Sequence, residues 1–156
     1  MAARQAAELM DRPVRVIPTK NIPQGMAALL SFDAGSSLDE NEKEMLHATR
    51  QITAGQVTYA VRESQINQLE IKKGQFMGLK NGEIVTVADQ LEECTLQLIR
   101  EMLTEESEII TLIYGQDVSK EQVDALVSTL ETTFPDHEVE VHDGGQPVYS
   151  YLISVE

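Results

Sequence analysis

The stretch IITLIYGQDVSKEQVDALVSTLETTFPDHEVEVHD, residues 109–143, decides the fold. It opens with a continuous apolar run over residues 109–114, which predicts a strand that is covered on both faces. Ser119 and Gln122 have the spacing of a capping box, and apolar residues recur behind them at helical spacing. Apolar and charged residues alternate over residues 138–142, as in an edge strand. Because a strand–helix–strand unit crosses over in the right-handed sense, we expect the two strands to be parallel.

The segments on either side extend this unit into an α/β fold. The turn over residues 143–147 is short, so the last strand, residues 148–155, should run antiparallel to its predecessor. Upstream, apolar residues at helical spacing predict a helix over residues 89–102, with Asp89 and Glu92 as its capping box. We therefore expect a mixed, mostly parallel sheet that is flanked by helices.

The first sixty residues predict three helices and two strands. The helices are expected over residues 1–10, 24–32 and 37–52, and the strands over residues 12–18 and 56–62. No Ser, Thr, Asp or Asn precedes the first helix as a cap, so we expect the chain to be a fragment of a longer polypeptide.

A small β region is expected between the two halves of the chain. Asn81-Gly82 lies between two alternating segments, which is the strongest short-range signal for a hairpin. A further short strand is expected over residues 69–72. We interpret residues 66–87 as a β-hairpin insertion within a single domain that spans residues 1–156.

Charge and composition exclude several classes of partner. The 156 residues include 26 acidic and 12 basic side chains, a net charge of −14, which repels nucleic acid and anionic lipid surfaces. The sequence contains neither a long apolar run nor a signal-peptide pattern, so we expect no stable membrane insertion and a cytoplasmic location. The single cysteine, Cys94, falls on the apolar face of a predicted helix and is expected to be buried.

The loops at strand ends are the candidate sites, because ligands of open α/β sheets bind there. The segment Thr19-Lys20-Asn21 before a helix could hold an anion, although an ordinary turn explains the same residues. Gly144-Gly145 permits a close backbone approach, and a plain tight turn explains it equally well.

No catalytic or metal-binding set stands out in the sequence. His137 and His142 have no cysteine nearby, so a metal site would need ligands from elsewhere and none is expected. Neither a Ser/His/Asp set, nor a Cys/His set, nor an aspartate-rich Mg²⁺ cradle occurs in a signature context. We therefore expect no catalytic residue in this chain.

Four separated blocks of sequence point to a known family. The blocks are VIPTKNIPQGMAALL (residues 16–30), VTYAVR (57–62), ITLIYG (110–115) and EVEVHDGGQPVY (138–149), followed by a terminal ISVE. Together they resemble the C-terminal region of the fatty acid kinase A family, which is also described as dihydroxyacetone-kinase-like fusion proteins. The resemblance covers essentially the whole chain in order.

The resemblance implies a DegV-like fold and a division of labour. In the family, an N-terminal kinase domain binds ATP and Mg²⁺, and a middle domain mediates homodimerisation. The C-terminal region engages a fatty-acid-binding DegV-like protein, which presents the acyl carboxylate for phosphorylation. The family's aspartate-rich nucleotide motif does not occur in this chain, so we expect no cofactor here.

The resulting hypothesis is a partner-binding module of a bacterial fatty-acid-kinase-like protein. A DegV-like domain that binds a small lipid or anion is the alternative, and an autonomous enzyme is the third. We expect polar and aromatic residues on strand-end loops to bind the partner or ligand, while the bland alternative is that these residues only specify turns and strand packing. The predicted binding residues are Thr19, Lys20, Asn21, Gln24, Arg62, Gly144, Gly145, Gln146 and Tyr149.

Overall fold

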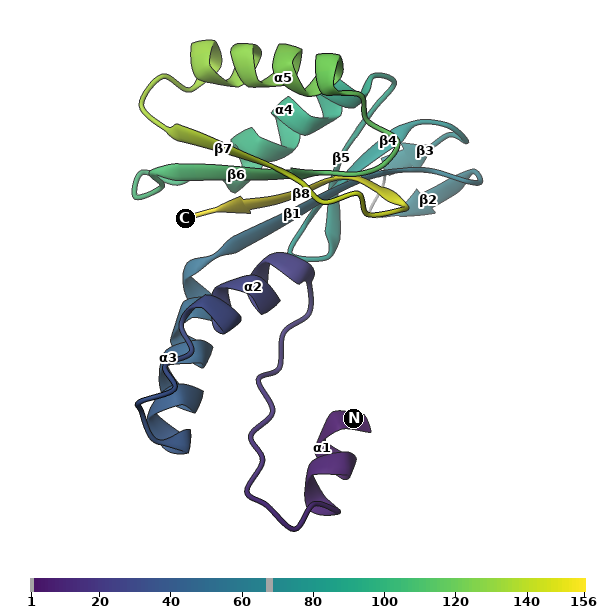
Figure 1. Cartoon of the computed structure of the whole chain (residues 1–156). Helices are drawn as coiled ribbons and strands as arrows, with labels where there is room; N and C mark the ends of the chain where they lie inside the picture. The colour runs from purple at the N-terminus through teal and green to yellow at the C-terminus, as the bar shows by residue number, and fades with distance from the viewer. Residues whose placement is uncertain (1, 67–68) are drawn as a thin grey trace. The chain divides into compact units, whose positions relative to one another are not determined.

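The computed structural model of the chain describes residues 2–66 and 69–156. The chain forms two compact units, Met1–Ile52 and Thr53–Glu156, which run from purple to blue and from blue to yellow in Figure 1. The single domain expected over residues 1–156 stays a prediction, since two compact units can belong to one domain. Each unit is described by itself.

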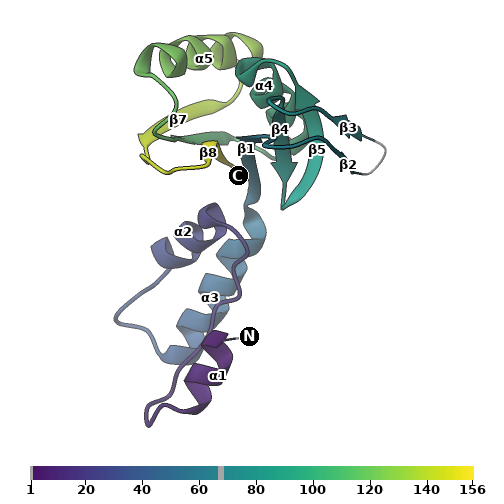
Figure 2. The same ribbon diagram turned by 90° about the vertical axis from the view of Figure 1, so that its right-hand side faces the viewer.

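The first unit consists of helices and connecting segments. The helices are α1 (Ala2–Glu8), α2 (Ile22–Leu30) and α3 (Leu38–Gln51), and α2 packs along α3 (Figure 2). All three were expected from the sequence. The strand expected over residues 12–18 is wrong, because this segment has no ladder partner and forms no strand.

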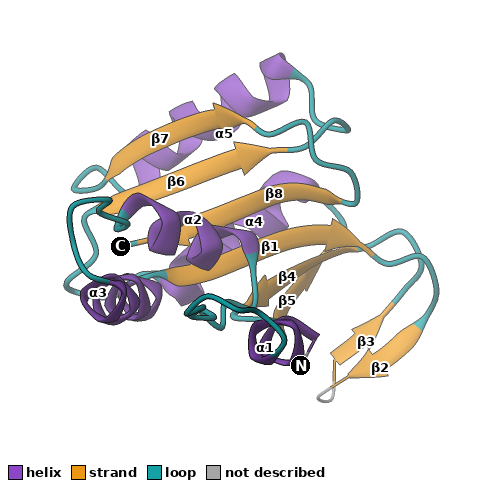
Figure 3. Cartoon of the chain, turned by 60° about the horizontal axis from the view of Figure 1, so that its bottom comes forward, coloured by secondary structure: helices purple, strands orange, loops and turns teal. Residues whose placement is uncertain are grey.

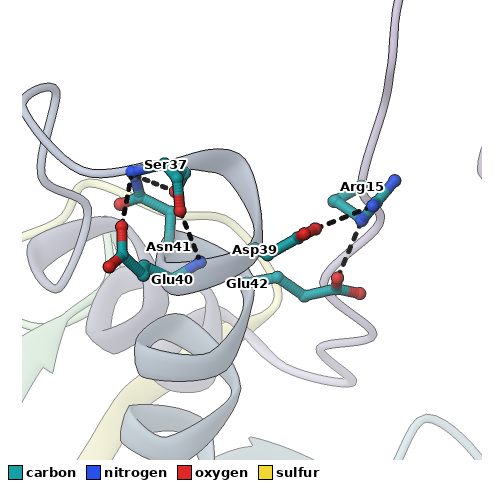
Figure 4. A network of polar contacts seen from close by, with 6 residues as sticks. All are labelled: Arg15, Ser37, Asp39, Glu40, Asn41 and Glu42. Carbon is teal, nitrogen blue, oxygen red and sulfur yellow. Dashed lines mark hydrogen bonds and ion pairs between the residues drawn. The ribbon is translucent and has the colours of Figure 1, made fainter.

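Side-chain hydrogen bonds fix the start of α3 (Figure 4). Ser37 and Glu40 form the predicted capping box, in which Ser37 Oγ accepts from Glu40 N at 3.3 Å and Glu40 Oε2 accepts from Ser37 N at 2.9 Å. The buried amide of Asn41 donates to the carbonyl oxygens of the preceding turn. Arg15 forms ion pairs with Asp39 at 2.8 Å and Glu42 at 2.9 Å, which attach the N-terminal segment to α3.

The second unit contains a six-stranded sheet in the order β5-β4-β1-β8-β6-β7 (Figure 3). The parallel pair β6–β7, joined through a helix, is the unit predicted from residues 109–143. The last strand, β8, lies between β1 and β6 and runs antiparallel to both. The strands of this sheet are β1 (Thr53–Tyr59), β4 (Phe76–Lys80), β5 (Glu83–Ala88), β6 (Ile109–Tyr114), β7 (Glu138–Asp143) and β8 (Tyr149–Val155).

The mixed α/β sheet is confirmed, but the expectation of a mostly parallel sheet is wrong. Of the five strand pairs in the described part of this sheet, only β6–β7 is parallel. The reason is that β8 does not pair with β7, the strand before it, but enters the sheet on the far side of β6. There it completes an antiparallel array with β1, β4 and β5.

Both helices of the second unit cover one face of the sheet (Figures 1 and 3). Helix α4 (Leu91–Met102) packs on β1, β4 and β5, and α5 (Lys120–Thr133) packs on β7. Their fully buried side chains, such as Leu98 and Leu130, form one core with the sheet. Cys94 is buried in that core as predicted, and burial raises the pKa of its thiol to about 12.

The predicted Asn81-Gly82 hairpin joins β4 and β5, and both turn residues have the positive φ that a type I′ turn requires. These two strands belong to the main sheet, so the separate β element is narrower than residues 66–87. It consists of β2 (Ser64–Ile66) and β3 (Leu69–Ile71), which pair apart from the six-stranded sheet (Figure 2). Residues 67 and 68 of the expected insertion lie outside the described residues.

Strand β7 forms one edge of the main sheet. Its side chains alternate between half-buried valines, which face the core, and the exposed Glu138, Glu140 and His142. This matches the edge strand expected from the alternating sequence.

Candidate functional site

The predicted binding residues of the first unit lie together at the start of α2. Asn21 is the N-cap, and its Oδ1 accepts a hydrogen bond from Gln24 N at 2.9 Å. The side chain of Gln24 reaches back, so that its Oε1 accepts from Lys20 N at 3.1 Å. Both side chains therefore fix the entry of the chain into α2, in the manner of a capping box.

This capping arrangement uses the backbone donors that an anion would need. The N–H groups of Thr19, Lys20, Gln24 and Gly25 donate to oxygen atoms of residues 17–24, and Pro23 has no N–H. The exposed side chains of Thr19 and Lys20 are what this segment offers to a partner.

The predicted residues of the second unit lie mainly in the loop of residues 143–149. The Nε2 of Gln146 donates to the carbonyl oxygens of Ile113 at 3.0 Å and Tyr149 at 3.2 Å, so this side chain holds the loop against β6. A Cβ at Gly144 would overlap the side chain of Gln146. Glycine is therefore required at residue 144 for a packing reason.

One residue of this loop has strained backbone geometry. Val148 has φ +74°, a left-handed conformation that is a genuine outlier for a β-branched residue, and its side chain is 62% exposed. Its carbonyl oxygen accepts from Thr58 Oγ1 at 2.7 Å, which ties the strained residue to β1. Strain of this kind persists only where the surrounding structure enforces it, and it is concentrated at binding sites.

A second loop, residues 115–118, contacts the first at the carboxyl end of β6. Gln116 N donates to Gln146 O, and a Cβ at Gly115 would overlap the carbonyl oxygens of Gln146 and Tyr149. Behind the two loops, the buried Ser150 donates to Asp117 Oδ2 at 2.7 Å. The sequence analysis missed this pair, although a serine inside an otherwise apolar strand was a signal for it.

Arg62 follows β1 at the same end of the sheet as Tyr149, because β1 and β8 are antiparallel and Thr58 pairs with Tyr149. Its side chain is exposed, and it takes part in none of the ion pairs found among the described residues. The structure thus brings five predicted residues to one end of the sheet in the second unit and four to the start of α2 in the first. Whether any of the nine binds a partner stays a prediction.

A groove between α4 and α5 was not predicted from the sequence. Its volume is about 590 Å³, and Leu91 and Leu96 of α4 and Leu126 of α5 form its apolar walls. Tyr151 of β8 forms its floor, and burial, with smaller effects of Glu92 and Asp117, raises the pKa of this phenol to about 12. The rim consists of Glu92, Glu93, Gln97, Arg100 and Gln122. No sequence signal gives the spacing between two helices on one face of a sheet.

The negative charge is concentrated in the second unit. Residues 53–156 contain nineteen acidic and six basic side chains, a net charge of −13, while residues 1–52 contain seven and six, a net charge of −1. One local effect concerns Tyr114, whose pKa is raised by burial and by the neighbouring Asp143.

Two further properties concern metals and membranes. Within residues 2–66 and 69–156, no three His, Cys, Asp or Glu side chains are grouped closely enough to hold a metal ion. None of the helices in the described part of the chain is long and apolar enough to span a membrane.

Comparisons with known proteins agree with this fold. An uncharacterized protein of Staphylococcus aureus (strain USA300) is 47% identical over 157 residues, and Protein YloV of Bacillus subtilis (strain 168) is 44% identical over 156 residues. Each alignment covers all of this chain and 28% of the relative, so the chain spans about a quarter of the length of these relatives.

Two solved structures have a similar fold. A DegV family protein from Corynebacterium glutamicum matches with a TM-score of 0.66 and 18% identity, over 99% of this chain and 69% of that one. The Fatty Acid Kinase (Fak) B3 protein of Streptococcus pneumoniae, loaded with linoleic acid, matches with a TM-score of 0.51 and 12% identity, over 86% of this chain and 54% of that one. The fold is therefore DegV-like, as the sequence resemblance implied.

The model of the FakA-like C-terminal family, which describes the C-terminal part of fatty acid kinase A-like proteins, matches residues 1–156, the whole chain. Together with the relatives that share more than two fifths of its residues, this match shows that the chain belongs to the FakA-like C-terminal family of fatty acid kinases.

Proposed function

We propose that this chain is the partner-binding module of a bacterial fatty-acid-kinase-like protein. The module docks a fatty-acid-binding DegV-like protein, and a kinase domain elsewhere in the same polypeptide phosphorylates the fatty acid that this partner presents. The observation that carries the proposal is the family match over all 156 residues, since this family is defined as the C-terminal part of fatty acid kinase A-like proteins.

The proposal assigns the chemistry to other parts of the kinase polypeptide. ATP and Mg²⁺ bind to the kinase domain, the whole polypeptide forms a homodimer, and the complex operates in the cytoplasm. The chain described here contributes recognition. A net charge of −13 on the second unit favours a protein partner with a basic surface over nucleic acid or anionic lipid.

The rigid loops at the end of the main sheet suit a recognition surface. Gln146 anchors residues 143–149 to β6, so the exposed Val148 and the nearby Arg62 are presented from a fixed frame. A preorganised loop loses less conformational entropy when it binds than a flexible one. At the start of α2, the exposed Thr19 and Lys20 are presented in the same way by the Asn21–Gln24 cap.

The second candidate function is a small-ligand domain of DegV-like type. The groove between α4 and α5 favours it, because a volume of about 590 Å³ lies in the usual range for small-molecule sites and its walls are apolar. In this case the occupant is a lipid or another small amphiphile, and the protein partner is dispensable.

One experiment separates the two functions. The purified chain is titrated by calorimetry with each DegV-family fatty-acid-binding protein of its own organism, and its melting temperature is measured with fatty acids, nucleotides and phosphate. We expect a complex with at least one DegV-family protein and no rise in melting temperature with the small ligands. No binding at tens of micromolar, together with a melting temperature that rises with a fatty acid, would transfer the function to the groove.

A further inference from the structure

Helix α2 has an unusual composition for the surface of a water-soluble unit. Residues 21–32, NIPQGMAALLSF, contain no charged side chain, and six of the nine residues of α2 are Ile, Met, Ala or Leu. A helix that is apolar around its whole circumference is normally buried on all sides. In the described structure, α2 is not.

The side chains of α2 are distributed in the opposite way to an ordinary amphipathic helix. The small residues Pro23, Ala27 and Ala28 are the buried ones. The large residues are exposed, with Leu30 at 84% and Leu29 at 71%. The exposed residues of this helix, which we call the α2 stripe, are Ile22, Met26, Leu29 and Leu30.

The spacing of the α2 stripe is that of a recognition helix. Its members are at positions i, i+4, i+7 and i+8, so they lie on one face. Helices that dock into the apolar groove of another protein present their anchors at this spacing. A contiguous apolar patch on an otherwise polar surface is typical of a protein interaction site.

The charge of the chain indicates what covers the stripe. A second copy would bring together two chains of −14 each, and self-repulsion of this size opposes association. A partner with a basic surface is instead attracted by the second unit, whose charge is −13. The first unit, at −1, adds almost no charge around α2 itself, so the stripe makes an apolar contact.

We propose that α2 is the anchor of the docking interaction, and that its stripe inserts into an apolar groove on a partner protein whose surrounding surface is basic. The inference rests on the proposed function, in which this partner is the fatty-acid-binding DegV-like protein. It differs from the loop surface predicted from the sequence, because the energy comes from burial of four large side chains and the acidic unit contributes mainly to the association rate.

The test compares two double variants of the chain. Met26→Gln/Leu30→Gln makes the stripe polar and keeps good helix formers, while Leu9→Gln/Val61→Gln changes two apolar residues that are 86% and 71% exposed elsewhere. Affinity for the DegV-family partner is measured by calorimetry at two salt concentrations, with circular dichroism as the check on folding. We expect the stripe variant to bind roughly tenfold more weakly or worse, and the control to stay within about twofold.

Two further readouts identify the occupant. Binding of the wild-type chain should weaken as salt rises, because opposite charges are screened. Amide hydrogen exchange should show protection of residues 26–30 in the complex, a result that does not depend on any variant. The single change Leu30→Ala should give a smaller loss of affinity in the same direction.

Each contrary result is distinguishable. A wild-type chain that binds while the stripe variant binds equally well overturns the role of α2 and leaves the proposed function standing. A chain that binds no DegV-family partner overturns both. If the wild-type chain instead forms dimers that strengthen with salt and are lost in the stripe variant, the occupant is a second copy and the proposed partner is wrong.

Discussion

The two units of the chain place their apolar residues in opposite ways. In the second unit, large side chains such as Leu98, Leu130 and Tyr151 are fully buried between two helices and a sheet. In the first unit, the buried residues of α2 are proline and alanine, and Leu29 and Leu30 are exposed.

This difference separates stability from recognition. The second unit contains the material of a conventional core, so its stability comes from burial within the chain. The first unit keeps its largest apolar side chains at the surface, where they contribute little to the stability of the free chain and are available to another protein. Matched substitutions in the two units test this difference.

The largest effect is expected from a core substitution in the second unit. Leu98→Ala removes a fully buried side chain that packs between α4 and the sheet, and should lower the free energy of unfolding by about 2–5 kcal/mol. The matched change in the first unit, Leu30→Ala, should alter it by less than about 0.5 kcal/mol, because this leucine is 84% exposed. Urea unfolding followed by circular dichroism measures both. Equal losses would mean that the two units do not differ in this way.

The next effect comes from two glycines. Gly115→Ala introduces a Cβ that overlaps two backbone carbonyl oxygens, so the loops at the end of β6 must shift, at a cost of about 1–3 kcal/mol. Gly25→Ala in α2 meets only an ordinary contact with Thr19 Oγ1 at 3.8 Å, and should stabilise the helix by about 0.5–1 kcal/mol. Thermal unfolding of both variants gives the signs. A neutral Gly115→Ala would show that the two loops are not held in contact.

The smallest effect concerns the cap of α3 and its dependence on pH. Hydrogen bonds from Ser37 hold the pKa of Glu40 below its ordinary value of 4.5, so their contribution is present above this pH and is lost as the pH falls through the lowered pKa. Ser37→Ala should cost about 1 kcal/mol of local helix stability. An NMR titration should show the pKa of Glu40 returning toward its ordinary value in the variant. An unchanged titration would place the cause elsewhere.

Much of the fold could be predicted because it depends on local signals. The Ser37 and Ser119 caps, the Asn81-Gly82 turn and the strand–helix–strand unit of residues 109–143 all follow from short-range spacing, and each is confirmed. Asp89 was expected to cap α4 but accepts a hydrogen bond from Gln75 instead, and Gln90 takes the cap position without a side-chain bond. That outcome depends on a neighbour 14 residues away, which no local pattern contains.

The arrangement of the strands could not be predicted in the same way. The position of β8 between β1 and β6 is a long-range choice, and the sequence of the turn before it is equally compatible with pairing to β7. The valines of residues 12–18 alternate like a strand, yet a strand needs a partner with free hydrogen-bonding groups, and this segment has none.

The candidate site was predicted at the level of loops and less well at the level of roles. Gln146, Asn21 and Gln24 were expected to contact a partner, and their side chains hold the loop of residues 143–149 and the start of α2. The exposure of the α2 stripe was not expected, because an apolar helix in a sequence is typical of a buried one. Only the structure distinguishes the buried alanines from the exposed leucines.

The acidic residues on the outer strand β7 have a consequence for the molecule at high concentration. A free strand edge is a template on which another chain can polymerise, and glutamates at residues 138 and 140 oppose this, because an identical strand laid against them would place like charges side by side. The protein can therefore expose an adhesive helix in its first unit without also offering its sheet as a seed for fibrils.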